Sequence, residues 1–386
     1  MADTPVLPLT GLRVVALEQA VAAPFCSRQL ADLGADVIKV ERPDGGDFAR
    51  AYDDALYGLS AYFAWLNRGK RSIVCDLKQP GDREVFGRLV AGADVFVHNL
   101  APGTVERLGF GYDELARQHP RLIWCGISGY GPDGPYRDKK AYDMLVQAES
   151  GVVSVTGTPD APAKVGISIA DSASGLYAYS SILAALINRD RTGKGERIDI
   201  SMLECLTEWM MPPIYVWRGS GHAPARAGIR HNMVVPYGAY ACADGAVIFS
   251  IQNEREWRRF CAQVLGRPSL ADDDRFATNA SRVRNRVELE RLIEDRFHAS
   301  TRSDLLALLD RADIASGALN DVAGIATHPQ LAARHRWVEV SSPVGAIPAF
   351  LPPHNLQHAP AHMRGVPALG EHTQEILAEL GLRRNQ

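Results

Sequence analysis

The chain has 386 residues, of which 46% are hydrophobic and 23% charged, and its formal net charge at pH 7 is −3. This length predicts two domains, and this charge argues against nucleic acid or an anionic membrane as the main partner. The sequence contains no run of about 18 apolar residues and no signal-peptide pattern near its start, so we expect a cytoplasmic protein that does not cross a membrane.

Cysteine and histidine spacing gives no support for a metal site. The six cysteines lie far apart without a C-x-x-C pair, and the eleven histidines include no H-E-x-x-H motif. Separate thiols in a cytosolic protein fit this pattern better than disulfides or bound zinc. We therefore expect no metal cofactor.

Strands and helices alternate along the first 210 residues. Apolar runs predict strands at 12–17, 36–40, 72–77, 94–99, 122–127 and 197–200. Helical patterns are expected at 24–34, 80–90, in pieces up to 118, and at 202–209. This alternation is typical of a wound α/β domain whose sheet is mostly parallel, and we assign that large domain to residues 1–212.

A second, smaller domain is expected after a change of composition near Pro212. Residues 213–226 are predicted to form a linker, and residues 227–315 a small α+β domain. The small domain is expected to hold a hairpin around Asp244-Gly245 and helices at 254–265, 285–298 and 302–312. Residues 316–386 would return through proline-rich segments and end in a helix at 374–380 that completes the large domain.

Asp171 is the candidate for the chemistry. It lies between a strand-like run at 165–170 and a helical pattern that starts near Ser172. A helix dipole at such a junction favours the ionised carboxylate, which can act as a nucleophile, and an unperturbed aspartate is ionised at neutral pH. Taken alone, the local pattern favours a simple helix cap, so the choice between the two roles depends on the rest of the chain.

Three glycine-containing motifs fail as nucleotide or hydrolase sites. Residues 129–134 match G-x-G-x-x-G, but Pro132 and Pro135 do not open the helix that a dinucleotide site requires. Residues 126–129 are one position short of G-x-S-x-G, and residues 192–195 lack the ending of a phosphate-binding loop. We interpret the last of these as a plain turn.

Basic residues recur where predicted strands end. These are Arg42, Lys78, Arg107 and Lys140. Strand ends are where an α/β sheet binds its ligands, and arginine and lysine suit phosphate groups. Each of the four taken singly is more plausible as a solvated charge, but together they indicate a polyanionic ligand.

Five motifs in order give the chain a family resemblance. They occupy residues 9–14, 33–41, 67–72, 191–195 and 369–373. With them the chain resembles the class III CoA-transferases, the family of formyl-CoA transferase and carnitine-CoA transferase, over essentially its whole length. The α-methylacyl-CoA racemases share this fold. The resemblance implies an interlocked homodimer, with a large wound domain and a small domain in each subunit.

The resemblance also implies functional residues. The nucleophile of the transferases is an aspartate, and it falls on Asp171. CoA or acyl-CoA would be the co-substrate, and the implied contacts are Val21, Ala22, Arg42, Cys75, Lys78, Asn99, Leu100, Ala101, Arg107, Lys140 and Tyr142.

Two departures from formyl-CoA transferase bear on the substrate. Val21 stands where that enzyme carries a glutamine, which argues against formate or oxalate chemistry. Its glycine-rich active-site loop is also absent, and the corresponding region offers Arg226, Arg230 and His231. Because arginine can bind a second carboxylate in a bidentate manner, we expect a small dicarboxylic acid such as succinate, itaconate or mesaconate.

Two other functions remain as alternatives. A racemase or epimerase needs two acid–base groups on opposite faces of the substrate. Tyr142 occupies the place of the racemase histidine, and Asn253 falls near the place of its glutamate, so both positions favour transfer. The second alternative is a CoA-binding protein without catalysis, against which Asp171 itself argues.

Overall fold

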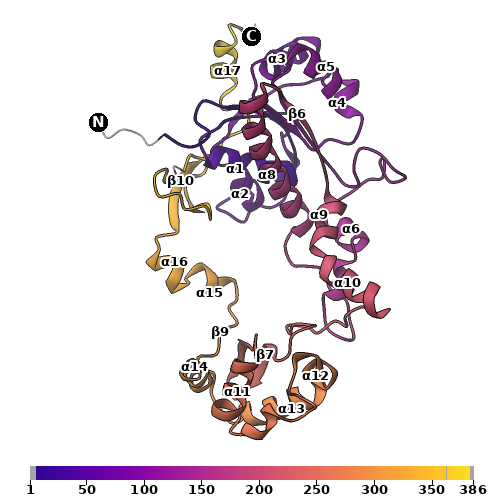
Figure 1. The fold of residues 1–386 in the computed structure, drawn as a ribbon. Coiled ribbons are helices and arrows are strands. Elements are labelled where there is room, and N and C mark those ends of the chain that lie inside the picture. The colour runs from indigo at the N-terminus through magenta and orange to yellow at the C-terminus, as the bar shows by residue number, and fades with distance from the viewer. Residues whose placement is uncertain (1–5, 362, 383–386) are drawn as a thin grey trace. The chain divides into compact units, whose positions relative to one another are not determined.

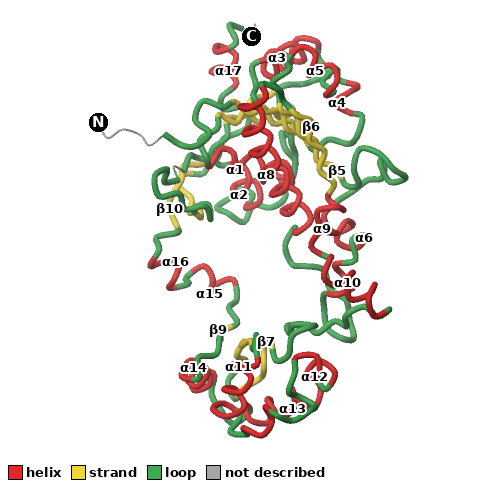
Figure 2. The backbone as a smooth tube through the Cα atoms, viewed as in Figure 1, coloured by secondary structure: helices red, strands yellow, loops and turns green. Residues whose placement is uncertain are grey.

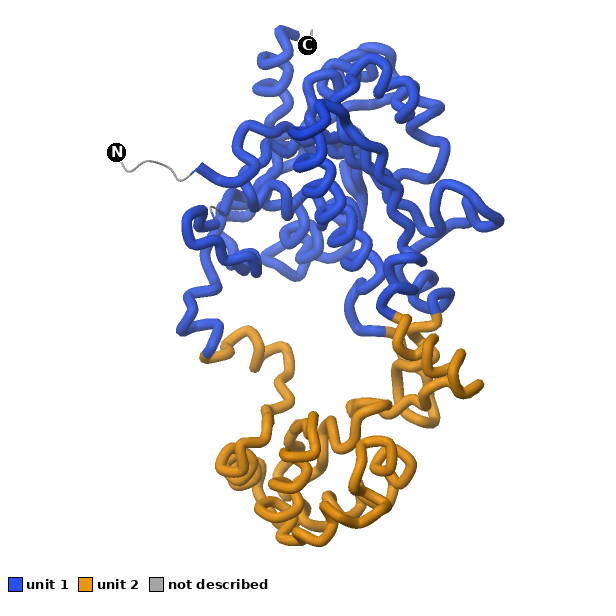
Figure 3. Tube along the Cα trace, viewed as in Figure 1, with its two compact units in different colours: residues 1–150, 165–209, 330–386 blue, residues 151–164, 210–329 orange. Residues whose placement is uncertain are grey.

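The computed structural model describes residues 6–361 and 363–382, and this part of the chain divides into two compact units (Figure 3). The first unit comprises the described residues up to 150, residues 165–209, and those from 330 onward. The second comprises residues 151–164 and 210–329. It is larger than the predicted small domain because it includes segments on both sides of 227–315.

A six-stranded parallel sheet forms the centre of the first unit, in the order β3-β2-β1-β4-β5-β6. Its strands are β1 (Arg13–Leu17), β2 (Asp36–Glu41), β3 (Arg71–Val74), β4 (Val95–His98), β5 (Ile123–Ser128) and β6 (Glu196–Ser201). The winding reverses between β1 and β4, which is where doubly wound sheets bind ligands at their carboxyl ends. The predicted wound parallel sheet is therefore confirmed.

Helices cover both faces of this sheet (Figure 1). On one face lie α1 (Ala22–Asp32) and α8 (Ile169–Thr192), and on the other α3 (Pro80–Ala91), α5 (Tyr112–Gln118) and α17 (Thr373–Glu379). Burial on both faces explains why the central strands β1, β4 and β5 are mostly apolar. The shorter helices are η1 (Phe48–Ala51), α2 (Ala61–Asn67), α4 (Thr104–Arg107), α6 (Asp143–Glu149), α9 (Met202–Trp209) and α16 (Pro329–Ala333).

Helices α1 and α8 approach closely at Gly175. A Cβ atom built on Gly175 would lie 2.5 Å from the carbonyl oxygen of Ala22, at the start of α1. Only glycine permits this approach without a shift of the backbone. Asp171 lies one turn before Gly175 on the same side of α8, so the packing of the two helices turns Asp171 toward the start of α1.

The C-terminal segment completes the edge of the sheet at β3. Arg71 of β3 forms ion pairs with Asp36, Glu375 and Glu379, the last two on α17. The N–H of His372 donates to the carbonyl of Ser72 at 3.0 Å. A separate antiparallel hairpin of β10 (Trp337–Ser342) and β11 (Gly345–Phe350) precedes this helix.

The second unit packs helices on a three-stranded antiparallel sheet (Figure 2). Its strands are β7 (Tyr237–Cys242), β8 (Gly245–Ser250) and β9 (Ser316–Ala318). Its helices are α7 (Val152–Val155), α10 (Met211–Ser220), α11 (Glu254–Arg259), η2 (Phe260–Val264), η3 (Pro268–Ala271), α12 (Asn279–Arg284), α13 (Arg286–Phe297), α14 (Arg302–Arg311) and α15 (Val322–Ala326). Phe249, Trp257, Phe260 and Phe297 meet in its core.

Two predicted features are wrong. Residues 165–168 form no strand, because β6 already pairs with β5 at that edge of the sheet, and α8 begins at Ile169 rather than near Ser172. The stretch 213–226 is not wholly irregular, since α10 runs through it to Ser220 with two prolines in its first turn, where they are tolerated. No helix among the described residues combines the length and apolarity needed to cross a bilayer.

Candidate active site

A large pocket of the first unit opens where strands of the parallel sheet end. It has a volume of about 1050 Å³, and its walls include residues 19–22 after β1, 99–102 after β4 and 127–129 after β5. Asp171 of α8 also lines it. The pocket therefore lies at the reversal point of the sheet, the position at which doubly wound folds bind their ligands.

Asp143 holds the start of α8. The N-cap residue Ser168 makes no side-chain capping bond. Instead, Oδ1 of Asp143, the first residue of α6, accepts the N–H of Ala170 at 2.8 Å and that of Asp171 at 3.3 Å. A carboxylate from another helix thus satisfies two N–H groups that the helix leaves unpaired, and it fixes the backbone that carries Asp171.

Gln147 supports this cap from one turn further along α6. Its side-chain amide is fully buried and donates to Oδ2 of Asp143 at 2.7 Å. Its amide oxygen accepts the N–H of Val165 at 2.9 Å. Gln147 therefore fixes both Asp143 and the irregular segment that leads into α8, where sequence analysis had predicted a strand.

The pKa of Asp171 is raised to about 7, first by burial and then by the negative charge of Asp143. This differs from the expectation of an unperturbed carboxylate, because burial and the charge of Asp143 both disfavour the ionised form. A carboxylate that is poorly solvated is a better nucleophile than one in water, and a strongly shifted pKa in a pocket is typical of a functional site.

The opposite wall is a short loop before α1 that is held at two points. The backbone of Gln19 is bonded reciprocally to the side-chain amide of Asn99, at 2.9 and 2.8 Å. The N–H of Ala20 donates to Oδ1 of Asp47 at 3.0 Å. Ala20 has a φ of 62°, which a residue other than glycine rarely adopts, so these bonds hold the wall in a strained conformation.

A buried ion-pair network lies beneath that loop. Its side chains belong to Glu18, Lys39, Asp47 and Lys70, and all four are fully buried. Nζ of Lys39 lies 2.8 Å from Asp47 and 3.3 Å from Glu18, and Nζ of Lys70 lies 2.6 Å from Glu18. Because Asp47 also holds Ala20, the network connects the core of the sheet to the wall of the pocket.

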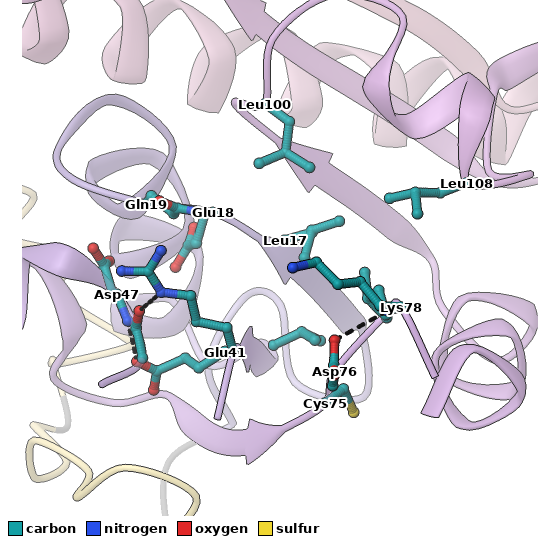
Figure 4. Close-up of a pocket in the computed structure, with 14 residues that line it drawn as sticks. Leu17, Glu18, Gln19, Glu41, Asp47, Cys75, Asp76, Lys78, Leu100 and Leu108 are labelled. Carbon is teal, nitrogen blue, oxygen red and sulfur yellow. Dashed lines mark hydrogen bonds between the residues drawn. The ribbon is translucent and has the colours of Figure 1, made fainter. Parts of the chain in front are cut away.

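A second pocket, of about 250 Å³, lies at the ends of β1, β2 and β3 (Figure 4). Its apolar walls include Leu17 and Leu108, and the side chain of Lys78 extends along it. Gln19 and Leu100 line both pockets, so the two are adjacent. A long ligand with a polar head and an extended arm is the kind of molecule that would occupy both.

The structure places most of the predicted co-substrate contacts in these two pockets. Val21, Ala22, Asn99, Leu100, Ala101, Lys140 and Tyr142 line the large pocket with Asp171. Arg42, Cys75 and Lys78, again with Leu100, line the small one. Arg107 lines neither, and its guanidinium lies over Gly103, beyond the end of β4. Binding of CoA by these residues stays a prediction.

The three residues predicted to bind a substrate carboxylate lie in the second unit, where each has local partners. Arg230 forms ion pairs with Glu290 and Glu294 of α13, so its charge is already balanced. Nε of Arg226 donates to the carbonyl of Thr158 at 2.9 Å. Nδ1 of His231 accepts two backbone N–H groups at 3.0 Å. Their role in substrate binding stays a prediction.

Sequence reasoning missed several residues of the large pocket. Asp143 follows Tyr142 directly, and its position at the start of a helical pattern was the available signal. Phe48, Tyr52 and Tyr62 form an aromatic wall in edge and tilted contacts, and they come from the short helices η1 and α2 and the residue that ends η1. Among the described residues no group of three or more His, Cys, Asp or Glu side chains is arranged to hold a metal ion.

A carboxylate with a raised pKa, held at the reversal point of a wound sheet beside two adjacent pockets, is typical of an enzyme active site. Comparison with known proteins specifies the class. The family model for CoA-transferase family III matches residues 9–373, and the chain belongs to this family.

Individual relatives agree with that assignment. A succinate–glutarate CoA-transferase of Agrobacterium fabrum is 38% identical, over 97% of this chain and 96% of its own length. An acetyl-CoA:oxalate CoA-transferase of Acetobacter aceti is 39% identical over 86% of each chain. The crystal structure of a CAIB/BAIF family protein from Brucella suis superimposes with a TM-score of 0.84 at 38% identity, and it covers 97% of this chain and 99% of that protein.

Proposed function

We propose that this enzyme transfers CoA from an acyl-CoA, such as succinyl-CoA, to a small dicarboxylic acid. The observation that carries the proposal is the carboxylate of Asp171, with its raised pKa, in the pocket at the reversal point of the sheet. The relatives that are named for succinate, glutarate and oxalate support a dicarboxylic substrate. The expectation that oxalate itself is a poor substrate stays a prediction based on Val21.

The first half of the reaction would use Asp171 as the nucleophile. Its carboxylate oxygen attacks the thioester carbonyl carbon, the C–S bond breaks, and the electron pair leaves with sulfur as CoA thiolate. The product is a mixed anhydride of Asp171 and the donor acid. The thiolate then attacks the Asp171 carbonyl, which releases the donor as a carboxylate and leaves an aspartyl-CoA thioester.

The second half repeats these steps in reverse with the acceptor. The acceptor carboxylate attacks the aspartyl thioester and displaces the thiolate, which then attacks the acceptor carbonyl and regenerates Asp171. Each tetrahedral intermediate carries an oxyanion, and the first N–H groups of α1 lie beside the pocket to stabilise it. Both covalent intermediates hydrolyse in water, so the bound substrates must exclude solvent.

Ionisation of Asp171 controls the first step. Only the carboxylate attacks, so activity should rise with pH through the raised pKa of about 7. Burial disfavours the carboxylate in the free enzyme, and formation of an uncharged anhydride or thioester removes that penalty. The same desolvation that raises the pKa therefore favours the covalent intermediates.

The second carboxylate of the acid requires a cation. Of the two candidate arginines, Arg226 is the stronger, because its guanidinium donates only to the backbone carbonyls of Thr158 and Pro159. Arg230 already pairs with two glutamates. We therefore assign the preference for a dicarboxylate to Arg226, with succinate or a five-carbon acid as the substrate.

Racemisation is the alternative on the same fold. It requires a second acid–base group across the substrate from Asp171. Asn253 cannot ionise, and its side chain caps α11 by accepting the N–H of Glu256 at 3.0 Å. Incubation with a 2-methylacyl-CoA in deuterated water should give no exchange at the α-carbon, whereas exchange as fast as transfer would favour the racemase.

We also propose that the enzyme is an interlocked homodimer in the cytoplasm, as its family resemblance implies. Light scattering on the purified protein should give twice the chain mass of 42.1 kDa. A single chain mass at micromolar concentration would contradict the dimer.

The central test is capture of the intermediate. The enzyme is incubated with succinyl-CoA, quenched with hydroxylamine or borohydride, digested, and analysed by mass spectrometry. Modification should map to Asp171 in the wild type and be absent from Asp171→Asn. Modification of another carboxylate, with full turnover in Asp171→Asn, would overturn the mechanism.

A further inference from the structure

Two guanidinium groups converge beyond the end of β4. A Cβ atom built on Gly103 would lie 3.0 Å from Nη1 of Arg107 and 3.7 Å from Nη2 of Arg137. Arg107 belongs to α4, and Arg137 to the exposed loop that follows β5. Gly103 has a φ of 77° and presents no side chain between the two groups. Two segments after neighbouring strands thus bring like charges to the same place.

Neither charge is balanced within the described residues. The side chain of Arg107 donates only to the hydroxyl of Thr104, at 2.9 Å, and Arg137 has no carboxylate partner there. Lys139, two positions along the same loop, contrasts with them because it pairs with Glu149 and stacks on Tyr136. Two unpaired guanidinium groups repel each other, and a bound anion removes that repulsion.

Arg137 also lines the pocket that contains Asp171, together with Lys140. An anion held by Arg107 and Arg137 would therefore be part of the ligand that occupies this pocket. Guanidinium groups bind phosphate oxygens in bidentate geometry, and the two negative charges of a terminal phosphate or of a diphosphate balance two of them. A carboxylate carries only one charge and matches this pair less well.

We infer that Arg107 and Arg137 together clamp a phosphate group of the bound CoA, and that Arg137 is a binding residue that no sequence motif indicates. This inference rests on the proposed function, since it takes acyl-CoA as the ligand of the pocket. The phosphate belongs either to the diphosphate bridge or to the 3′ position of the ribose. Both sources have the same chemistry, and they are separated by the ligand used.

Calorimetry on the full-length enzyme tests the clamp without turnover. We compare CoA with 3′-dephospho-CoA in the wild type, Arg137→Ala, Arg107→Ala and the double variant. Arg137→Ala should raise the Kd for CoA about tenfold or more, as expected for loss of a charge-assisted bond. The fold-increase in Kd for the double variant should be smaller than the product of the fold-increases for the two single variants, because both residues hold the same phosphate.

Arg117→Ala is the matched control. Arg117 lies on α5, is exposed, and donates to the carbonyl of Asp113, so its removal changes the net charge equally. CoA affinity should stay within twofold in this variant. Arg137→Lys should recover part of the lost affinity, because it restores the charge without the bidentate geometry.

The ligand comparison identifies the phosphate. If the clamp holds the 3′-phosphate, the wild type binds 3′-dephospho-CoA weakly and Arg137→Ala weakens it no further. If it holds the diphosphate, Arg137→Ala weakens both ligands equally. Unchanged CoA affinity in Arg137→Ala, or an equal loss in Arg117→Ala, overturns the clamp. Failure of the wild type to bind CoA at all would instead contradict the proposed function.

Discussion

Two pairs of arginines, one from each unit, show different uses of charge. In the second unit, Arg230 pairs with two glutamates, and Arg282 with Glu254 while it donates to backbone carbonyls. In the first unit, Arg107 and Arg137 stand at the ends of strands without a carboxylate partner among the described residues. Cations of the first kind stabilise the fold, whereas those of the second kind are available to a ligand.

The largest effect is expected at the proposed nucleophile, Asp171. Asp171→Ala and Asp171→Asn should lower kcat by about a thousandfold or more, since the proposed covalent steps need a carboxylate at this position. A spectrophotometric assay with succinyl-CoA and a second dicarboxylate measures this loss. Turnover within tenfold of the wild type would show that Asp171 is not the nucleophile.

Asp171→Asn should also be more stable than the wild type. A carboxyl group whose pKa is raised in the folded state makes the protein less stable as the pH rises from the pKa of that group in the unfolded chain through about 7. At pH 8 the free energy of unfolding of Asp171→Asn should therefore be about 1–3 kcal/mol higher than that of the wild type, since one unit of pKa shift corresponds to about 1.4 kcal/mol. Chemical denaturation at pH 5 and pH 8 checks that the gain is larger at pH 8.

Buried and exposed lysines sharpen the contrast between structural and available charge. Lys39→Met removes the shared partner of Glu18 and Asp47 in the buried network, and it should cost about 3–5 kcal/mol of unfolding free energy. Lys139→Met breaks an exposed pair with Glu149 and should cost less than about 1 kcal/mol. Equal losses in urea denaturation would contradict the distinction.

The charge of Asp143 should set part of the pH dependence. Asp143→Asn removes a negative charge beside Asp171, while its amide oxygen can still accept the N–H of Ala170. The midpoint of kcat/KM against pH, expected near 7, should move down by about one unit. Glu149→Gln makes the same charge change on α6 and should leave the midpoint in place. An unchanged midpoint in Asp143→Asn would mean that burial alone raises the pKa.

The smallest effects separate the two arginines of the second unit. Arg226→Ala should reduce the preference for succinate over butyrate as acceptor about three- to tenfold, as expected for loss of one exposed charge-assisted contact. Arg230→Ala should lower stability by about 1–2 kcal/mol and leave that preference unchanged, because its charge already serves Glu290 and Glu294. The reverse result would move the carboxylate site to Arg230.

The sequence predicted the parts of the fold that repeat with a regular period. The central strands β1, β4 and β5 are mostly apolar, and the helix at 202–209 has the observed bounds. The local geometry of Asp171 was not predictable, because its cap comes from Asp143, 28 positions earlier, and depends on Gln147. The pairing of Arg230 likewise depends on residues 60 and 64 positions later. Such contacts have no local pattern.

The contact between Gly175 and the carbonyl of Ala22 has a consequence for redesign of this enzyme. The atoms nearest to a Cβ built on Gly175 belong to the carbonyl of Ala22 and the side chain of Phe25, and none belongs to the aromatic wall of the pocket. Phe48, Tyr52 and Tyr62 can therefore be varied in a library without altering the register of α8 on α1. Substitutions in this aromatic wall would change the shape of the pocket and leave the position of Asp171 unchanged, which makes the wall a suitable place to begin a redesign.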